Sequence, residues 1–194
     1  GSIDNTYNVA KSFEEEIRLQ IIRNKSNLGL ARSLNLGIAA SSGHLIARMD
    51  DDDLSMPERI SKQVEFMIEN PNVDVLGTGV ILVNDLGEHI KTQVKPQNDK
   101  EIKRALCREN PLFHPTVLMR RAFLMRVGGY DETFRRKEDY ELWGRAAKSS
   151  IYHNLQEPLV HYRVKQYKTL KALPASVKVR LQNGRLMNCF FRAL

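Results

Sequence analysis

The segment His44-Leu45-Ile46-Ala47-Arg48-Met49-Asp50-Asp51-Asp52-Asp53 joins an apolar run directly to four consecutive aspartates. We expect the apolar run to form a strand, with the aspartates at its end, where open α/β sheets bind ligands. Adjacent carboxylates repel one another unless a cation neutralises them, and hard oxygen donors favour Mg2+ or Mn2+. The aspartates therefore predict a divalent metal site, although a solvated acidic turn that caps the next helix would also explain them.

Candidate strands and helices alternate on both sides of this segment. Apolar patterns and turn residues predict strands at Arg18–Ile22, His44–Met49, Val73–Val83, Glu88–Val94, Pro115–Met119 and Leu155–Val164. Helices are predicted at Leu30–Ala40, Glu101–Arg108, Arg121–Val127 and Glu138–Lys148. A further helix is predicted after the aspartates, with Ser55 as its N-cap and Glu58 completing a capping box. Strand and helix alternate early and strands pair later, so the sequence predicts an α/β domain with a mixed sheet.

The composition is that of a globular protein and argues against intrinsic disorder. The 194 residues are 42% hydrophobic and 27% charged, enough for one domain with a core. Lysine and arginine number 30 against 23 acidic residues, and this charge of +7 suits an anionic partner such as a nucleotide, a phospholipid surface or a nucleic acid. No run of about 18 apolar residues predicts a membrane span. Cys107 and Cys189 have neither metal-ligand spacing nor a disulfide framework, which favours a reducing compartment.

A second acidic feature, Glu138-Asp139, opens a predicted helix. Acidic side chains in a first turn interact favourably with the helix dipole, and that alone would explain them. The functional interpretation is a general base, because a carboxylate near a second anionic site can accept a proton from a hydroxyl. Trp143, one turn into the same helix, is either a platform for a sugar ring or, as is commoner, a core aromatic.

Further motifs follow one another along the chain: Asn27-Leu28-Gly29, Leu34-Asn35-Leu36-Gly37, Met56-Pro57-Glu58-Arg59, Val75-Leu76-Gly77-Thr78, His114-Pro115-Thr116, Gly128-Gly129-Tyr130-Asp131 and Tyr162-Arg163. Together with the two acidic features, their order and spacing resemble the family 2 glycosyltransferases of GT-A fold, particularly the bacterial kind that builds surface polysaccharides. The resemblance implies a Rossmann-like mixed sheet flanked by helices. It covers residues 1–164, which we expect to form a partial GT-A catalytic domain.

The resemblance implies a role for each acidic residue. Asp50 and Asp52 resemble the family's Asp-x-Asp. This implies that Asp52 ligates Mn2+ or Mg2+ on the diphosphate of a nucleotide-sugar, and that Asp50 faces the ribose or donor sugar and is a further metal ligand. Asp51 is then a neighbouring substrate-binding residue. Asp139 resembles the base that deprotonates the acceptor hydroxyl, and Glu138 is implied to position substrate.

Two other residues are implied in substrate binding. His114 lies where the family approaches the acceptor pocket, although a histidine before a proline is more often structural. Lys165 follows Tyr162-Arg163, where many relatives have a histidine that reaches the metal or diphosphate. A protonated lysine would contact phosphate as a point charge and would not ligate a metal.

The resemblance also implies the reaction. An acceptor oxygen attacks the anomeric carbon from the face opposite the leaving diphosphate, so a single displacement inverts the configuration. We expect a UDP-sugar as donor, a hydroxyl of a glycan or lipid-linked acceptor, and a place in bacterial polysaccharide biosynthesis. The enzyme is expected in the cytoplasm, at the inner face of the membrane, and a homo-oligomer is left open.

The start of the chain departs from the family. Gly1-Ser2-Ile3-Asp4-Asn5-Thr6 resembles the turn that follows the family's second strand, so the preceding strand, helix and strand are expected to be missing. Those elements supply much of the pocket for base and ribose. We therefore expect the chain as it stands to bind nucleotide weakly, which makes a catalytically impaired transferase fragment an alternative interpretation.

Residues 165–194 lie outside the family core and are predicted to form a basic helical extension. Apolar residues such as Val177, Leu181 and Phe190 lie beside Lys178 and Arg185. Such a helix would either contact a membrane surface peripherally or pack back on the domain.

Two other functional classes fit the sequence less well. A phosphohydrolase with an aspartyl nucleophile usually has Thr or Val two residues beyond the second Asp of its Asp-x-Asp, where this chain has Leu54, and it would not use Glu138-Asp139. A nucleic-acid-binding protein would use the positive charge, but no recognised module is present, and the aspartates would repel phosphates without a metal. We therefore expect no nucleic-acid partner.

Overall fold

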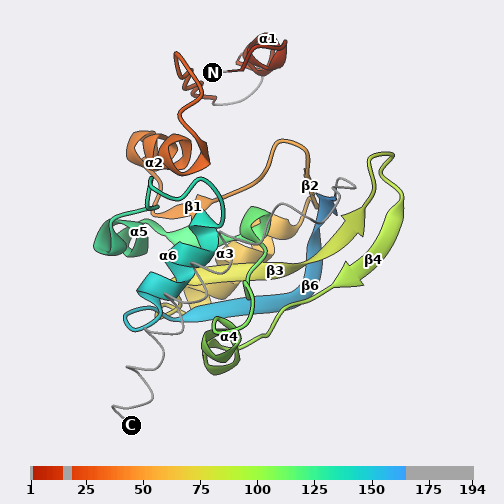
Figure 1. Ribbon diagram of the computed structural model, residues 1–194. Helices are drawn as coiled ribbons and strands as arrows, with labels where there is room; N and C mark the ends of the chain where they lie inside the picture. The colour runs from red at the N-terminus through yellow and green to blue at the C-terminus, as the bar shows by residue number, and fades with distance from the viewer. Residues whose placement is uncertain (1, 15–18, 165–194) are drawn as a thin grey trace.

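The computed structural model describes residues 2–14 and 19–164, which fold around one mixed sheet (Figure 1). Within these ranges the sheet has six strands in the order β1-β5-β3-β6-β2, and β4 pairs with β3. Its strands are β1 (Leu45–Ala47), β2 (Leu54–Ser55), β3 (Val75–Val83), β4 (His89–Gln93), β5 (Leu118–Arg120) and β6 (Tyr152–Arg163). The β3–β6 pair is parallel and the other pairs are antiparallel.

Helices cover both faces of this sheet. The described helices are α1 (Thr6–Lys11), which lies apart from the sheet, and α2 (Leu30–Ala40), α3 (Arg59–Glu69), α4 (Asp99–Ala105), α5 (Arg121–Val127) and α6 (Glu138–Ala146), with a 3₁₀ turn η1 (His114–Thr116). In Figure 1, α6 lies in front of the sheet and α3 lies behind it. The arrangement confirms the expected mixed α/β architecture.

Strand β3 forms the centre of the sheet because it is apolar along almost its whole length. Eight of its nine residues are buried, as is typical of a strand that is covered on both faces. Its parallel pairing with β6 runs from Val75 opposite Tyr152 to Val83 opposite Arg163. A Cβ atom at Gly77 would lie 2.2 Å from the Asn154 Oδ1, so any larger residue here would displace the buried Asn154 side chain.

Side chains alternate along β3 between two parts of the core. Val75 faces the larger cluster, to which α6 contributes Leu142 and Trp143. Leu76 faces the opposite side, where it packs with Met67 of α3. Because α6 carries core residues directly after Glu138 and Asp139, packing against the sheet fixes the position of these two carboxylates.

Several predicted elements are confirmed. The helices α2 and α5 have the predicted bounds, and α5 ends at Gly128, whose φ of 77° is in the left-handed region. That conformation is typical of the glycine that follows a helix C-terminus.

Three local predictions are wrong. Ser55 does not cap α3, because it is paired with Val160 in β2 and its hydroxyl donates to the Met56 carbonyl. Pro115 lies in η1, and the strand begins only at Leu118, since the fixed φ of proline and its lack of an N–H suit a tight turn. Residues 19–22, the described part of the predicted strand Arg18–Ile22, form no strand.

The predicted extension 165–194, including Lys165, lies outside the described residues. Among the helices that the structure describes, none combines the length and apolar character needed to cross a bilayer.

Candidate functional site

A cavity of about 400 Å³ gathers most of the residues that the sequence singled out. The segment after β1 contributes Asp50, η1 contributes His114, and the first turn of α6 contributes Glu138 and Asp139. The cavity is lined by Leu30, Arg48, Asp50, Lys95, Asn110, Leu112, Phe113, His114, Pro115, Lys137, Glu138, Asp139 and Tyr162. Two acidic features that are far apart in sequence therefore share one cavity.

Asp50 is held by a residue that the sequence did not assign to the site. Both guanidinium Nη atoms of Arg48 donate to its carboxylate, Nη1 to Oδ2 at 2.6 Å and Nη2 to Oδ1. Arg48 is itself buried, and its carbonyl accepts from the Arg59 Nη2 at 2.8 Å. The arginine neutralises Asp50 and fixes its orientation toward the cavity.

The other three aspartates of the run differ in burial. Asp51 is exposed, Asp52 is half-buried and Asp53 is buried. Asp53 Oδ1 accepts from the backbone N–H of Arg163 at 2.8 Å, and the Arg163 Nε donates to the Asp52 carbonyl at 3.0 Å. Burial raises the pKa of Asp53 to about 6. Asp53 therefore joins the aspartate segment to the end of β6 and does not line the cavity.

The residue before the Glu138-Asp139 pair has a strained backbone conformation. Lys137, directly before the helix, has a φ of 65°, which is uncommon for a residue with a Cβ atom and costs free energy. Both carboxylates are buried, with 5% of Glu138 and 8% of Asp139 exposed. Burial raises the pKa of Glu138, and the Asn110 Nδ2 donates to Asp139 Oδ2 at 2.5 Å. Both members of this pair are therefore buried, whereas the four aspartates of the run differ in exposure.

His114 lies between the acid pair and the core. Its Nε2 is 2.8 Å from the Tyr130 hydroxyl, and its Nδ1 is 3.9 Å from Glu138 Oε1. Burial lowers the pKa of His114 to about 4, so the ring is neutral at pH 7. A neutral imidazole offers one donor and one acceptor, which suits a hydroxyl group on either side of the ring.

Tyr130, the partner of His114, is positioned by a motif whose role the sequence did not reveal. Asn35 Oδ1 accepts from the Tyr130 N–H at 2.9 Å, and Asn35 Nδ2 donates to the Tyr130 carbonyl at 2.9 Å. A Cβ atom at Gly129, whose φ is 69°, would lie 2.7 Å from Asn35 Oδ1. The motifs around Asn35 and Gly129 therefore act together to support His114.

Trp143 belongs to the core. It is fully buried, and its ring centroid lies 6.5 Å from that of Phe123 and 6.4 Å from that of Tyr152. It also meets His114 edge-on at 6.3 Å. The interpretation of Trp143 as a core aromatic is confirmed, and its contribution to the site is to support the histidine.

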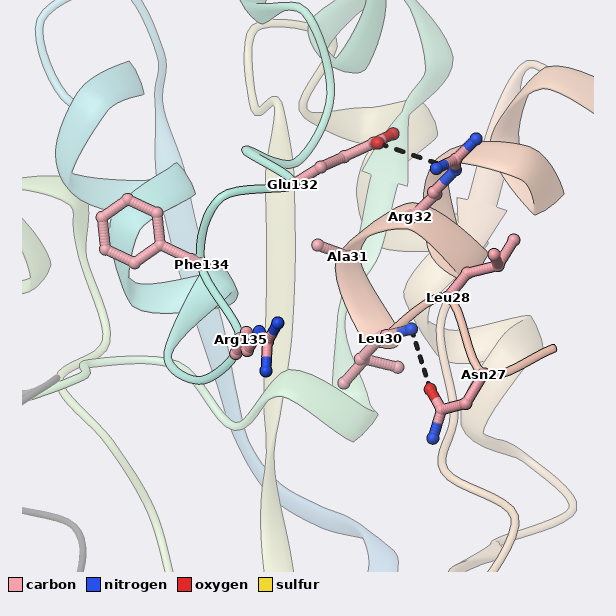
Figure 2. Close-up of a pocket in the computed structure, with 9 residues that line it drawn as sticks. Asn27, Leu28, Leu30, Ala31, Arg32, Glu132, Phe134 and Arg135 are labelled. Atoms are coloured by element: carbon pink, nitrogen blue, oxygen red, sulfur yellow. Dashed lines mark hydrogen bonds and ion pairs between the residues drawn. The ribbon is translucent and has the colours of Figure 1, made fainter. Parts of the chain in front are cut away.

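A second cavity, of about 600 Å³, lies between the start of α2 and the loop before α6 (Figure 2). Figure 2 shows Arg32 and Glu132 pointing toward each other, as an ion pair of 3.9 Å, while Phe134 turns away from α2. Both members of this ion pair are about half exposed. None of the predicted site residues lines this cavity, so we place the candidate site in the smaller one.

Two sets of side chains in and beside the site suit a divalent cation. Asp50 and Asp52 offer hard oxygen donors, although both oxygens of Asp50 already accept from Arg48. Among the described residues, His114, Glu138 and Asp139 offer ligand atoms that all lie within 4.8 Å of one another. The chemistry of both donor sets fits a cation such as Mn2+.

Most of the chain resembles known transferases. Residues 1–128 match the model of the family described as Glycosyl transferase family 2. The chain is 35% identical over 146 residues to the O-antigen biosynthesis glycosyltransferase WbnJ of Escherichia coli, covering 74% of this chain and 56% of that protein. It spans about half the length of the curated relatives it matches.

Two solved structures share the fold. One is S. aureus TarS 1-349 in complex with UDP-GlcNAc, with a TM-score of 0.70, 17% identity, and coverage of 88% of this chain and 49% of that one. The other is the mannosyltransferase PcManGT from Pyrobaculum calidifontis in complex with GDP-Man and Mn2+, with a TM-score of 0.56, 16% identity, and coverage of 99% and 53%. These likenesses confirm the GT-A fold, and because the family match covers well over half of its residues, the chain belongs to glycosyl transferase family 2.

Proposed function

We propose that this protein moves a sugar, with inversion, from a UDP-sugar to a hydroxyl of a glycan or lipid-linked acceptor in bacterial polysaccharide biosynthesis. The observation that carries the proposal is the single cavity into which Asp50, Glu138 and Asp139 converge. Family membership supports sugar transfer, and the O-antigen relative supports a polysaccharide product. We assign residues 1–164 to the catalytic domain and 165–194 to its extension.

Asp139 is the proposed base. It lies at the start of α6 and is held by Asn110, so its carboxylate has a fixed position beside the cavity. As the acceptor oxygen attacks the anomeric carbon, its O–H bond breaks and the proton passes to Asp139, while the bond from the anomeric carbon to the diphosphate oxygen breaks. A base in this position contributes about 100- to 10,000-fold to such a transfer.

Glu138 and His114 are proposed to orient the acceptor. Burial raises the pKa of Glu138, and its carboxylate oxygens can accept hydrogen bonds from sugar hydroxyls. The neutral ring of His114 has one nitrogen beside Tyr130 and the other toward Glu138, so its orientation is set before substrate binds. Preorganised groups of this kind lower the entropy lost in reaching the transition state.

Asp50 and Asp52 are the proposed ligands of a divalent cation, Mn2+ or Mg2+. When bound, such a cation would stabilise the charge that develops on the leaving diphosphate. Asp51 and Lys165 are proposed to contact the donor. Arg48 orients Asp50, because its guanidinium spans both carboxylate oxygens.

The charge of the chain supports the remaining parts of the proposal. A formal charge of +7 favours an acceptor or membrane surface that carries phosphate. We therefore place the reaction in the cytoplasm, at the inner face of the membrane, with peripheral contact through the extension. The proposal includes a homo-oligomer of this protein as a further partner arrangement.

The direct test is a transfer assay on the protein as its gene encodes it. UDP-glucose, UDP-galactose or UDP-N-acetylglucosamine is supplied with Mn2+ and a diphosphoprenol-linked sugar, and UDP release and the anomeric configuration of the product are measured. We expect UDP release that requires the acceptor, stops in EDTA and gives the inverted anomer. Retention of configuration would exclude the mechanism, and acceptor-independent turnover of a generic phosphate ester would indicate a phosphohydrolase.

A further inference from the structure

We propose that Asn110 is a positioning residue for Asp139: its side-chain amide selects which carboxylate oxygen receives the proton. The inference rests on the proposed function, because it requires Asp139 to be the base. Asn110 Nδ2 donates to Asp139 Oδ2 at 2.5 Å, and both residues line the same cavity. The two residues are 29 positions apart in the sequence, so the contact is a product of the fold.

The orientation of the Asn110 amide is fixed by a local contact. Asn110 Oδ1 accepts from the Leu112 N–H at 3.3 Å, two residues further along the chain. If the amide were reversed, its carbonyl oxygen would face a carboxylate and its NH2 group would face an N–H, and both contacts would be repulsive. The backbone turn before η1 therefore directs the donor, Nδ2, at Asp139.

The direction of this hydrogen bond has a consequence for the reaction. Because Asp139 Oδ2 accepts from Asn110, the acceptor hydroxyl is deprotonated by Oδ1. The same hydrogen bond fixes the plane of the carboxylate, so Oδ1 keeps one position beside the cavity.

A neutral donor is chemically suited to this task. An arginine or lysine in the same place would form an ion pair with Asp139 and make it a poorer base. An amide keeps the carboxylate oriented while adding no charge to the cavity.

The chain provides a matched control at Asn84. Its Oδ1 also accepts from an N–H two residues ahead, that of Leu86, and its Nδ2 also donates to a carboxylate, that of Glu88. Asn84 does not line the cavity. Replacing either asparagine by alanine removes the same kind of turn contact and the same kind of amide–carboxylate hydrogen bond, but only one of the replacements affects Asp139.

The experiment measures kcat and the KM values for donor and acceptor in the protein as its gene encodes it. We expect Asn110→Ala to lower kcat by about 10- to 100-fold with little change in either KM, since misplacing a catalytic group by about 1 Å costs on this order. Asn84→Ala should keep the wild-type kcat. Asn110→Ser can still accept from the Leu112 N–H but cannot reach Asp139, so it should behave like Asn110→Ala.

Each other outcome is informative. Wild-type kcat in Asn110→Ser together with a loss in Asn110→Ala would show that the asparagine only stabilises the turn, and the inference would be wrong. An equal loss in Asn84→Ala would have the same meaning. Circular dichroism would show whether Asn110→Ala unfolds. In that case Asn110→Ser and the nearly isosteric Asn110→Asp test the inference instead. Asn110→Asp should lose at least as much kcat as we expect for Asn110→Ala, because it places a second charge against Asp139.

A double-mutant cycle separates this inference from the proposed function. In an Asp139→Asn background, Asn110→Ala should cause no further loss of kcat. Near-wild-type turnover of Asp139→Asn alone would refute the base assignment and the proposed function with it. Loss of turnover in Asp139→Asn but not in Asn110→Ala would refute only the positioning role.

Discussion

The two acidic segments of this protein, Asp50–Asp53 and Glu138-Asp139, look similar in sequence but are used differently by the fold. In the first, burial separates the residues: Asp51 is exposed, whereas Asp53 is buried against the backbone of Arg163. In the second, both carboxylates are buried in the first turn of one helix and face one cavity. A run of identical side chains in an irregular segment can therefore divide its tasks, while a helix packed on a sheet holds its acids together.

The largest expected difference between the two segments is in turnover. Asp139→Asn should lower kcat by about 1,000-fold or more, because the amide cannot accept the acceptor proton. Asp53→Asn should cost a few-fold at most, since Asp53 does not line the cavity. Steady-state transfer assays at pH 7.5 would measure both values. A larger loss in Asp53→Asn than in Asp139→Asn would reverse the division of tasks described here.

The second segment depends on the core beneath it, and the next prediction tests this support. Trp143→Ala should lower the free energy of unfolding by about 3 to 5 kcal/mol, since it removes a fully buried indole that packs on Phe123 and Tyr152. Urea unfolding followed by circular dichroism would measure it. Leu86→Ala, at a side chain that is 82% exposed, is the control and should change stability by no more than about 0.5 kcal/mol. Equal effects would mean that Trp143 is not in the core.

The sequence predicted the end of α5 correctly and the cap at Ser55 wrongly, and the reason is the range of the interactions that fix each one. The bounds of α5 follow from local signals, its apolar periodicity and the glycine that ends it. The capping box at Ser55 failed although its signal was equally local, because pairing with Val160 of β6 holds Ser55 in an extended strand. Tertiary pairing between segments about a hundred residues apart overrides a local preference of about 1 kcal/mol.

The same limit applies to the site. The residue types singled out the segments that contain Asp50, Glu138 and Asp139, and the family resemblance added His114. The fold brings these four into one cavity. Arg48 and Asn110, which hold two of them, carried no signal of their own. Their roles depend on where their side chains point once the sheet and α6 have packed, and no periodicity encodes that direction.

The third prediction concerns pH and His114, the residue that supports the second segment. Burial lowers the pKa of His114 to about 4, below its unfolded value of about 6.5. The unfolded state therefore binds the proton more tightly, and stability is lost as pH falls from about 6.5 to about 4, by about 2 to 3 kcal/mol. His114→Gln should remove this loss, so the free-energy difference between variant and wild type, from urea unfolding, should shrink from pH 8 to pH 4. A constant difference would show that His114 is not buried in the neutral form.

The smallest effect belongs to the first segment and has the opposite sign. Burial raises the pKa of Asp53 to about 6, above the unfolded value of about 3.9, so the folded state binds this proton more tightly. The resulting stability is present below the unfolded pKa and is lost as pH rises through about 6. Asp53→Asn should therefore gain about 1 to 2 kcal/mol over wild type between pH 4 and pH 8, measured by urea unfolding in EDTA. Asp51→Asn is the control, because its carboxylate is exposed to water in both states. If Asp51→Asn showed the same change with pH, the contrast between buried and exposed members of the run would fail. A change in Asp53→Asn only would show that the buried environment distinguishes two aspartates that are two residues apart.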